Sequence, residues 1–221
     1  MTEPNPDIAR FNMIEQQVRP WDVLDQRVLD VLREVPREDF VPEDKRALAF
    51  MDLAIPIGHG EAMFPPKLEG RLLQALALRP GDRVLEVGTG SGFLTACLAR
   101  LAGQVLSVDI HEDFTERAGQ RLANHGIDNV TLETGDAAWG WRHGELEFDA
   151  IAVTGAVAEY DTRFEEQLAV GGRLFIIVGR APVMEAMLVT RTGPEAFDRT
   201  GLFETSVKHL LGREPRPGFV L

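Results

Sequence analysis

The stretch that decides the fold is Arg83-Val84-Leu85-Glu86-Val87-Gly88-Thr89-Gly90-Ser91-Gly92. Its first half is a mostly apolar run typical of a buried strand, and its second half is a turn in which every other residue is glycine. Glycine has no side chain to keep a ligand away from the backbone, so such a turn suits close contact. Because ligands of open α/β sheets bind beyond the carboxyl ends of the strands, the stretch predicts a ligand site at this turn.

Strands and helices alternate on the carboxyl side of this turn. Strands are expected at Val105–Ile110, Val130–Glu133, Phe148–Val153 and Arg173–Val178, and helices at Phe93–Ala102, Phe114–His125 and Thr162–Leu168. This alternation predicts a parallel sheet with helices on both faces, which is a Rossmann-like α/β fold. Met187–Arg191 and Leu202–Val207 also have strand character, and we expect them to pair antiparallel at the sheet edge.

The residues before the turn have mainly helical character. Apolar positions at helical spacing predict helices at Phe11–Val18, Val23–Val35 and Lys67–Leu78. An extended linker is expected at Val35–Pro42, and Leu53–Gly58 is a short apolar segment. We therefore expect a single domain over residues 1–221, composed of an N-terminal helical cap and active-site loop at 1–79, a cofactor-binding core at 80–180 and C-terminal strands at 181–221.

The composition argues against several classes of protein. The 221 residues carry a net charge of -12, whereas non-specific binding of nucleic acids depends on Lys and Arg, so a nucleic-acid partner is not expected. The single cysteine cannot form an internal disulfide. No apolar stretch approaches the roughly 20 residues that span a bilayer, and the N-terminus has no apolar signal core. We expect a cytoplasmic protein without membrane contact.

The glycine turn also discriminates between two nucleoside ligands. A dinucleotide site has the spacing Gly-x-Gly-x-x-Gly and holds a pyrophosphate at the helix N-terminus, but here the glycines are evenly spaced. Glu86 would repel a pyrophosphate and attract the ammonium group of a methionine moiety. Asp109 ends the next strand, where a carboxylate accepts ribose hydroxyls, and Asp136 ends the third, where it can meet adenine. These features favour S-adenosylmethionine over a nicotinamide cofactor.

Short stretches along the whole chain follow the order found in one family. They are Gln16–Val18, Val35–Pro42, Ile55–Gly58, Pro80–Gly92, Asn129–Val130, Gly135–Asp136, Phe148–Ile151, Val153–Thr154, Gln167–Leu168 and Gly171–Leu174. Through them the chain resembles the protein-L-isoaspartate O-methyltransferase family over nearly its full length, and Val35–Pro42 is the stretch specific to it. The resemblance implies a seven-stranded class I methyltransferase sheet with an N-terminal helical cap, S-adenosylmethionine as cofactor, and protein repair by methylation of an isoaspartyl carboxylate.

The same resemblance implies which residues bind the cofactor. The glycines of the turn would line it, Asp109 would hold the ribose, and Asp136 with Ala137 would meet the adenine. The full expected set is Ala62, Met63, Glu86, Gly88, Thr89, Gly90, Ser91, Gly92, Asp109, Ile110, Gly135, Asp136, Ala137 and Thr154. No metal ligand is expected, and the sequence does not predict the oligomeric state.

One loop departs from the family pattern. The family's loop contains a serine, regarded as the active-site residue, often two positions after a threonine. In this chain Phe64 takes the place of the serine and Ala62 that of the threonine, so both hydroxyls are absent. A bulky apolar side chain desolvates a charged acceptor without offering a hydrogen bond. We expect Phe64 to suit an apolar or aromatic acceptor better than an isoaspartyl carboxylate.

The acceptor therefore stays open between a damaged protein or peptide and an unidentified small molecule or RNA. A carboxylate is already ionised and needs no general base, but a hydroxyl or amine acceptor would benefit from one. His59 and Glu61 lie in the same loop and are candidate bases, although an ordinary loop residue is the favoured interpretation of each. With Phe64 they form the expected catalytic set. A different class of function is a non-catalytic module that binds S-adenosylmethionine as a sensor.

Overall fold

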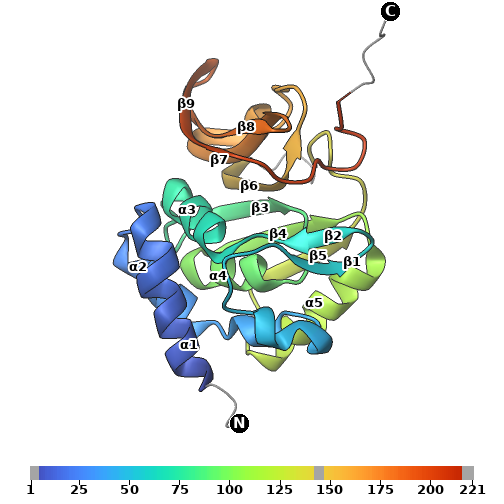
Figure 1. Cartoon of the computed structure of the whole chain (residues 1–221). Coiled ribbons are helices and arrows are strands. Elements are labelled where there is room, and N and C mark those ends of the chain that lie inside the picture. The colour runs from blue at the N-terminus through green and yellow to red at the C-terminus, as the bar shows by residue number, and fades with distance from the viewer. Residues whose placement is uncertain (1–4, 142–146, 216–221) are drawn as a thin grey trace, which may run out of the picture.

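The computed structural model describes residues 5–141 and 147–215. Its main sheet is built from β3 (Arg83–Val87), β4 (Gln104–Asp109), β5 (Val130–Thr134), β6 (Phe148–Val157), β7 (Leu168–Arg180), β8 (Val183–Gly193) and β9 (Ala196–Thr205). The strand order is β5-β4-β3-β6-β7-β8-β9 (Figure 1). The first five strands in this order run parallel, and β8 and β9 are antiparallel to their neighbours. The predicted seven-stranded α/β sheet is confirmed, including its antiparallel edge.

Alternate residues of the central strands pack into two different cores. Val84 belongs to the larger core, which receives side chains from all five α-helices among the described residues, whereas the next residue, Leu85, belongs to the smaller core. This follows from the period of two in a strand. The described part of the smaller core contains no α-helical residue. The expectation of α-helices on both faces of the sheet was therefore wrong for the described residues: at Thr162–Leu168, where a helix was expected, only a 3-10 turn forms, at Glu165–Gln167.

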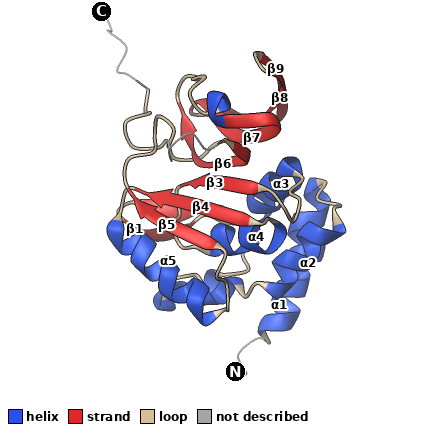
Figure 2. Cartoon of the chain, turned by 180° about the vertical axis from the view of Figure 1, so that it is seen from behind, coloured by secondary structure: helices blue, strands red, loops and turns tan. Residues whose placement is uncertain are grey.

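The helices lie on the side of the larger core (Figures 1 and 2). Their bounds are α1 Pro6–Met13, α2 Gln26–Glu34, α3 Pro66–Leu76, α4 Phe93–Leu101 and α5 Glu112–Asn124. The start predicted for the first helix was five residues late, because Asn5 caps α1 and Pro6 occupies its first turn. Likewise α2 begins after Asp25, whose carboxylate accepts the Arg27 N–H. None of the helices described within 5–141 and 147–215 has the length and apolar character needed to cross a bilayer.

The linker expected at Val35–Pro42 is compact rather than extended. It contains a 3-10 turn at Arg37–Asp39, and the Arg37 side chain is completely buried. Its Nε donates to the Ala49 carbonyl at 2.8 Å, its Nη2 donates to the Phe64 carbonyl at 2.7 Å, and its Nη1 pairs with the buried Glu69 of α3. A charged group is tolerated in a core only when it is paired and hydrogen-bonded, and these partners satisfy that need. Arg37 thereby ties the linker to the loop that carries Phe64.

A hairpin of β1 (Ile55–Gly58) and β2 (Glu61–Met63) lies apart from the main sheet. Its turn residues His59 and Gly60 have φ values of +52° and +71°. Two successive residues with positive φ are what a tight hairpin turn of this twist requires. The sequence predicted only a short apolar segment at Leu53–Gly58; in the structure this segment contains the first strand of the hairpin, and the second strand carries Ala62 and Met63.

The segment that follows β9 returns to the carboxyl end of β6. The Ala156 N–H donates to the Lys208 carbonyl, and the Leu210 N–H donates to the Ala156 carbonyl, both at 2.9 Å. Further along, the buried Arg213 donates to the carbonyl of Ala138 at 2.8 Å. Residues 205–211, called the return segment below, are therefore held against the sheet.

Candidate functional site

A cavity of about 400 Å³ opens at the carboxyl ends of β3, β4, β5 and β6. Four walls enclose it: the turn after β3, the ends of β4 and β5, the hairpin with its following loop, and the return segment. All residues expected to bind a cofactor line this cavity except Glu86 and Gly92. This is the position at which open α/β sheets bind their ligands.

The glycine turn can approach a ligand because side chains are excluded from it. A Cβ atom on Gly88 would lie 2.1 Å from the Thr154 hydroxyl oxygen, which itself donates to the Val87 carbonyl at 2.8 Å. Gly88 and Gly90 also have positive φ values, of +100° and +51°. Gly92 has a different role, because it begins α4 and its Cβ would collide with Ala118 of α5 at 2.9 Å. Gly92 thus allows α4 and α5 to pack closely and does not line the cavity.

Asp109 presents its carboxylate to the cavity from the end of β4. One oxygen accepts the Gly90 N–H at 2.8 Å and the other accepts the His111 N–H at 2.9 Å. Burial raises the pKa of Asp109, while these two backbone donors act in the opposite direction. Each carboxylate oxygen has a second lone pair, so Asp109 can still accept hydrogen bonds from a ligand.

Glu86 lies behind the turn instead of in the cavity wall. Its side chain is fully buried, and its Oε2 accepts the hydroxyl groups of Thr95 at 2.5 Å and Ser107 at 2.6 Å. The Ser107 oxygen in turn lies 2.6 Å from the hydroxyl oxygen of Thr89, which does line the cavity. Burial raises the pKa of Glu86 to about 8. The structure therefore places Glu86 behind the turn, outside the cavity lining, where it supports the turn through Ser107 and Thr89.

The three catalytic candidates have different surroundings. His59 does not line the cavity; its ring stacks on His111 at 4.0 Å and its Nε2 lies 2.9 Å from an Asp113 oxygen. Glu61 does line the cavity, but its carboxylate is ion-paired with Lys208. Phe64 lines the cavity and is partly buried against the larger core. Of these three, the structure brings Glu61 and Phe64 to the cavity and places His59 outside it.

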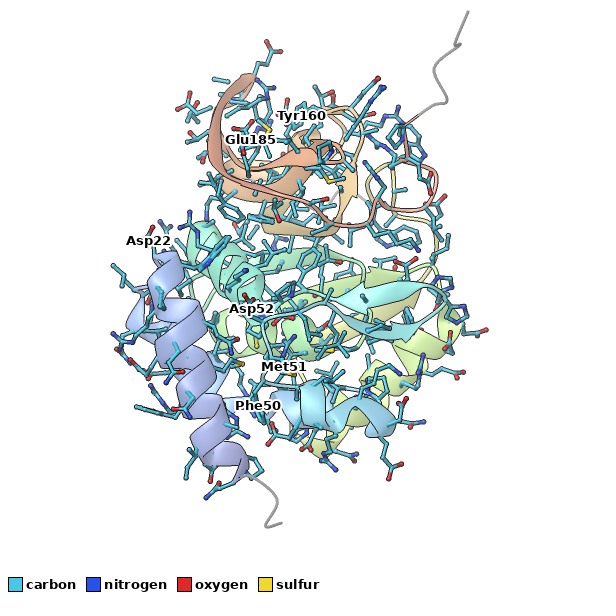
Figure 3. All side chains as sticks on the ribbon, in the orientation of Figure 1. Asp22, Phe50, Met51, Asp52, Tyr160 and Glu185 are labelled. Atoms are coloured by element: carbon cyan, nitrogen blue, oxygen red, sulfur yellow. The ribbon has the colours of Figure 1, made fainter. Side chains whose placement is uncertain are left out.

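Several lining residues were not identified from the sequence. Lys67 of α3 lies 4.3 Å from the centre of the Trp21 ring and 2.7 Å from Asp52, which is labelled in Figure 3. Lys208 lies on the return segment and donates to the Gly60 carbonyl at 3.2 Å. Trp21, Lys67 and Lys208 all line the cavity. Nothing in their local sequence marks them, because the fold alone brings these distant segments together.

Comparisons with known proteins agree with this architecture. The sequence model of the protein-L-isoaspartate(D-aspartate) O-methyltransferase family matches residues 10–202. The chain is 42% identical over 190 residues to protein-L-isoaspartate O-methyltransferase 2 of Anaeromyxobacter sp. (strain Fw109-5), covering 85% of this chain and 77% of that relative. It is 40% identical over 192 residues to a protein-L-isoaspartate O-methyltransferase of Methylorubrum populi, covering 87% and 90%.

Solved structures share the fold. A protein-L-isoaspartate O-methyltransferase from Plasmodium falciparum in complex with S-adenosyl-L-homocysteine matches with a TM-score of 0.79 at 21% identity, over 94% of this chain and 99% of that chain. A second protein-L-isoaspartate O-methyltransferase matches with a TM-score of 0.77 at 24% identity, over 93% and 66%. From the family match and the sequence identities, this chain belongs to the protein-L-isoaspartate(D-aspartate) O-methyltransferase family, a family of S-adenosylmethionine-dependent methyltransferases.

Proposed function

We propose that the protein transfers the methyl group of S-adenosylmethionine to the free carboxylate of an isoaspartyl residue in a damaged protein or peptide. One observation carries this proposal: a single cavity joins the glycine turn and Asp109 to a second region walled by the hairpin loop and the return segment. Such a cavity can hold a nucleoside at one end and an acceptor at the other. Membership of the family identifies the chemistry.

The residues present at the cofactor end fit S-adenosylmethionine. Gly88 and Gly90 line the cavity with backbone alone, and Asp109 can accept two ribose hydroxyls. Ile110 offers an apolar side chain, 44% exposed, for the face of the adenine. Asp136 has one oxygen oriented by the Ala138 N–H at 2.9 Å, and its carboxylate can accept the adenine amino group.

The chain itself has to align the acceptor and exclude water. When bound, S-adenosylmethionine supplies a methyl group on a positively charged sulfur: the carboxylate oxygen bonds to the methyl carbon, the carbon–sulfur bond breaks, and its electron pair stays on sulfur. A carboxylate is ionised at neutral pH, so no proton has to move and no base is required. This agrees with the placement of His59 outside the cavity and the pairing of Glu61 with Lys208. Alignment and exclusion of water can together supply most of the rate enhancement of such a displacement.

The test is methyl transfer to a pair of peptides that differ only in containing an isoaspartyl or an aspartyl residue. We expect formation of S-adenosylhomocysteine and a base-labile methyl ester with the isoaspartyl peptide only. Binding of S-adenosylmethionine by calorimetry, measured on the same protein, separates the two halves of the proposal. Tight binding of S-adenosylmethionine without turnover of either peptide would reject the isoaspartyl carboxylate as acceptor and keep S-adenosylmethionine as the cofactor.

Asp109→Ala is expected to weaken the binding of S-adenosylmethionine by about tenfold or more, about 1.4 kcal/mol. The physical reason is the loss of the carboxylate that accepts the ribose hydroxyls. The measurement is the dissociation constant by calorimetry. Asp113→Ala is the matched control, because Asp113 is a nearby exposed carboxylate that does not line the cavity. Equal dissociation constants for wild type and Asp109→Ala would remove Asp109 from the cofactor site.

A second candidate function is methylation of an apolar acceptor, and the position of Phe64 in the cavity wall favours it. Phe64→Ser combined with Ala62→Thr should raise kcat/KM on the isoaspartyl peptide by about tenfold, because two hydroxyl donors replace apolar groups beside the carboxylate. Phe64→Leu is the control, since it shortens the side chain without adding a donor. If the wild type already methylates the isoaspartyl peptide efficiently and the double variant gains nothing, Phe64 does not restrict the acceptor.

A further inference from the structure

The acceptor end of the cavity has few groups that could receive an anion. The hairpin loop contributes Ala62, Met63 and Phe64, which have no side-chain hydrogen-bond donor. A carboxylate that leaves water for such a wall loses hydration and needs a compensating charge or donor. The return segment adds the hydroxyls of Thr205 and Ser206 and the ring of His209, whose Nε2 lies 2.9 Å from the Gly179 carbonyl oxygen. A full positive charge comes from the two lysines that line the described cavity, Lys67 and Lys208, so the question is which of them is available.

The ammonium group of Lys67 already contacts a carboxylate and an aromatic ring. Its ammonium lies 2.7 Å from an Asp52 oxygen and 4.3 Å from the centre of the Trp21 ring, and its side chain is 25% exposed. Both lysines are paired with a carboxylate, but Lys67 also has the Trp21 ring against its ammonium and is about half as exposed as Lys208, at 25% against 48%, so it is the less accessible to a further anion. Lys67 therefore forms part of the wall.

Lys208 reaches across the cavity from a rigid base. Its carbonyl accepts the Ala156 N–H of β6 at 2.9 Å, and Thr154, two residues before Ala156, donates to the Val87 carbonyl next to the glycine turn. From there the side chain extends to the opposite wall, where its ammonium donates to the Gly60 carbonyl and pairs with Glu61. The side chain is 48% exposed, so an entering acceptor can reach it.

We infer that Lys208 is the specificity-determining residue that receives the acceptor carboxylate. The inference rests on the proposed function, because it assigns a residue to the same acceptor. An ammonium group has three N–H donors, and the described residues supply two acceptors for them, Gly60 and Glu61. The third donor is available for the acceptor, and Glu61 weakens the attraction because its carboxylate competes for the same cation.

The chemistry predicts which kinetic constant Lys208 controls. The acceptor carboxylate starts with a full negative charge and becomes a neutral ester as the new carbon–oxygen bond forms and the carbon–sulfur bond breaks. A fixed cation therefore stabilises the bound acceptor more than the transition state. Its removal should raise KM for the acceptor while leaving kcat unchanged or slightly higher.

The experiment measures initial rates of the full-length protein on the isoaspartyl peptide at saturating S-adenosylmethionine. Lys208→Met should raise KM by about tenfold or more with kcat within about twofold of wild type, and Lys208→Arg should recover part of the loss because it restores the charge. Glu61→Gln should lower KM, since it frees the ammonium. Lys45→Met is the matched control, because Lys45 pairs with Asp44 and does not line the cavity.

A second measurement separates binding of the acceptor by Lys208 from a purely structural role, in which Lys208 only holds the hairpin in place. Ala62 and Met63 of the hairpin line the cavity, so a loosened hairpin would weaken the binding of S-adenosylhomocysteine, whereas loss of an acceptor contact would leave that dissociation constant within about twofold. An unchanged KM in Lys208→Met, or a fall in nucleoside affinity that accounts for the lost rate, would overturn the assignment while the proposed function stands. Absence of turnover in the wild type would reject the proposed function and this inference together.

Discussion

Arg37→Met is expected to lower the free energy of unfolding by about 3–5 kcal/mol. The substitution leaves Glu69 as a buried carboxylate without its cationic partner, and it removes the donors to the Ala49 and Phe64 carbonyls. An unpaired buried charge or an orphaned carbonyl retains its desolvation penalty in the folded state, so the whole effect appears as lost stability. The loop with Phe64 should also lose its anchor, which would lower activity.

Urea unfolding of the wild type and the variant measures this effect. Glu69→Leu in the Arg37→Met background should recover part of the loss, because it removes the stranded carboxylate. Arg33→Met is the matched control: Arg33 also pairs with an aspartate, Asp30, but on the exposed face of α2, and its loss should change stability by less than about 0.5 kcal/mol. Equal unfolding free energies for Arg37→Met and Arg33→Met would contradict the structural role of Arg37.

The second large effect concerns pH, and it arises at Glu86. Burial raises the pKa of this carboxyl from an ordinary 4.5 to about 8 in the folded protein. In the unfolded chain the proton leaves near 4.5, so between these two values the folded state binds more protons than the unfolded state. Stability therefore falls as pH rises through this window, by up to about 1.4 kcal/mol per pH unit. The contribution of Glu86 is complete below pH 4.5 and lost above about pH 8.

Glu86→Gln is neutral at every pH and should escape this loss. We expect the difference in unfolding free energy between the variant and the wild type to shift in favour of the variant by roughly 3 kcal/mol from pH 5 to pH 8. Urea unfolding at one-unit pH intervals measures the shift, and Glu43→Gln, which changes an exposed carboxylate, should follow the wild-type curve. Parallel pH profiles for Glu86→Gln and wild type would show that Glu86 is ionised in the folded state.

The sequence predicted the parts of this molecule that local signals encode. The strand with its glycine turn and the alternation of strands and helices depend on patterns of a few residues, and the structure has them. The position of Asp109 could be predicted because it is the last residue of a strand, and the carboxyl ends of parallel strands meet at the ligand-binding edge of the sheet. The division into a helical cap, a core and C-terminal strands, the cytoplasmic location and the role of each site residue stay predictions, and residues 216–221 of the last segment lie outside the described residues.

Where the structure places a site residue away from the cavity, the cause is the neighbours that decide the environment of its side chain. Glu86 has the spacing of a ligand-binding residue, but Ser107 and Thr95 enclose it behind the turn. His59 lies on a loop, yet its contacts with His111 and Asp113 hold it outside the cavity. Lys208 could not be selected from the other lysines, because its partner Glu61 is 147 residues away in the sequence.

That separation also bears on the order in which the walls of the cavity can form as the chain is made. The hairpin leaves the ribosome early, but it stays without its opposite wall until the return segment has been made and has docked beside β6. A contact across so much chain is expected to form late, because the entropy cost of closing a long loop comes before the contact can stabilise the chain. A nascent chain that ends before residue 205 therefore has the glycine turn but lacks one wall of the cavity.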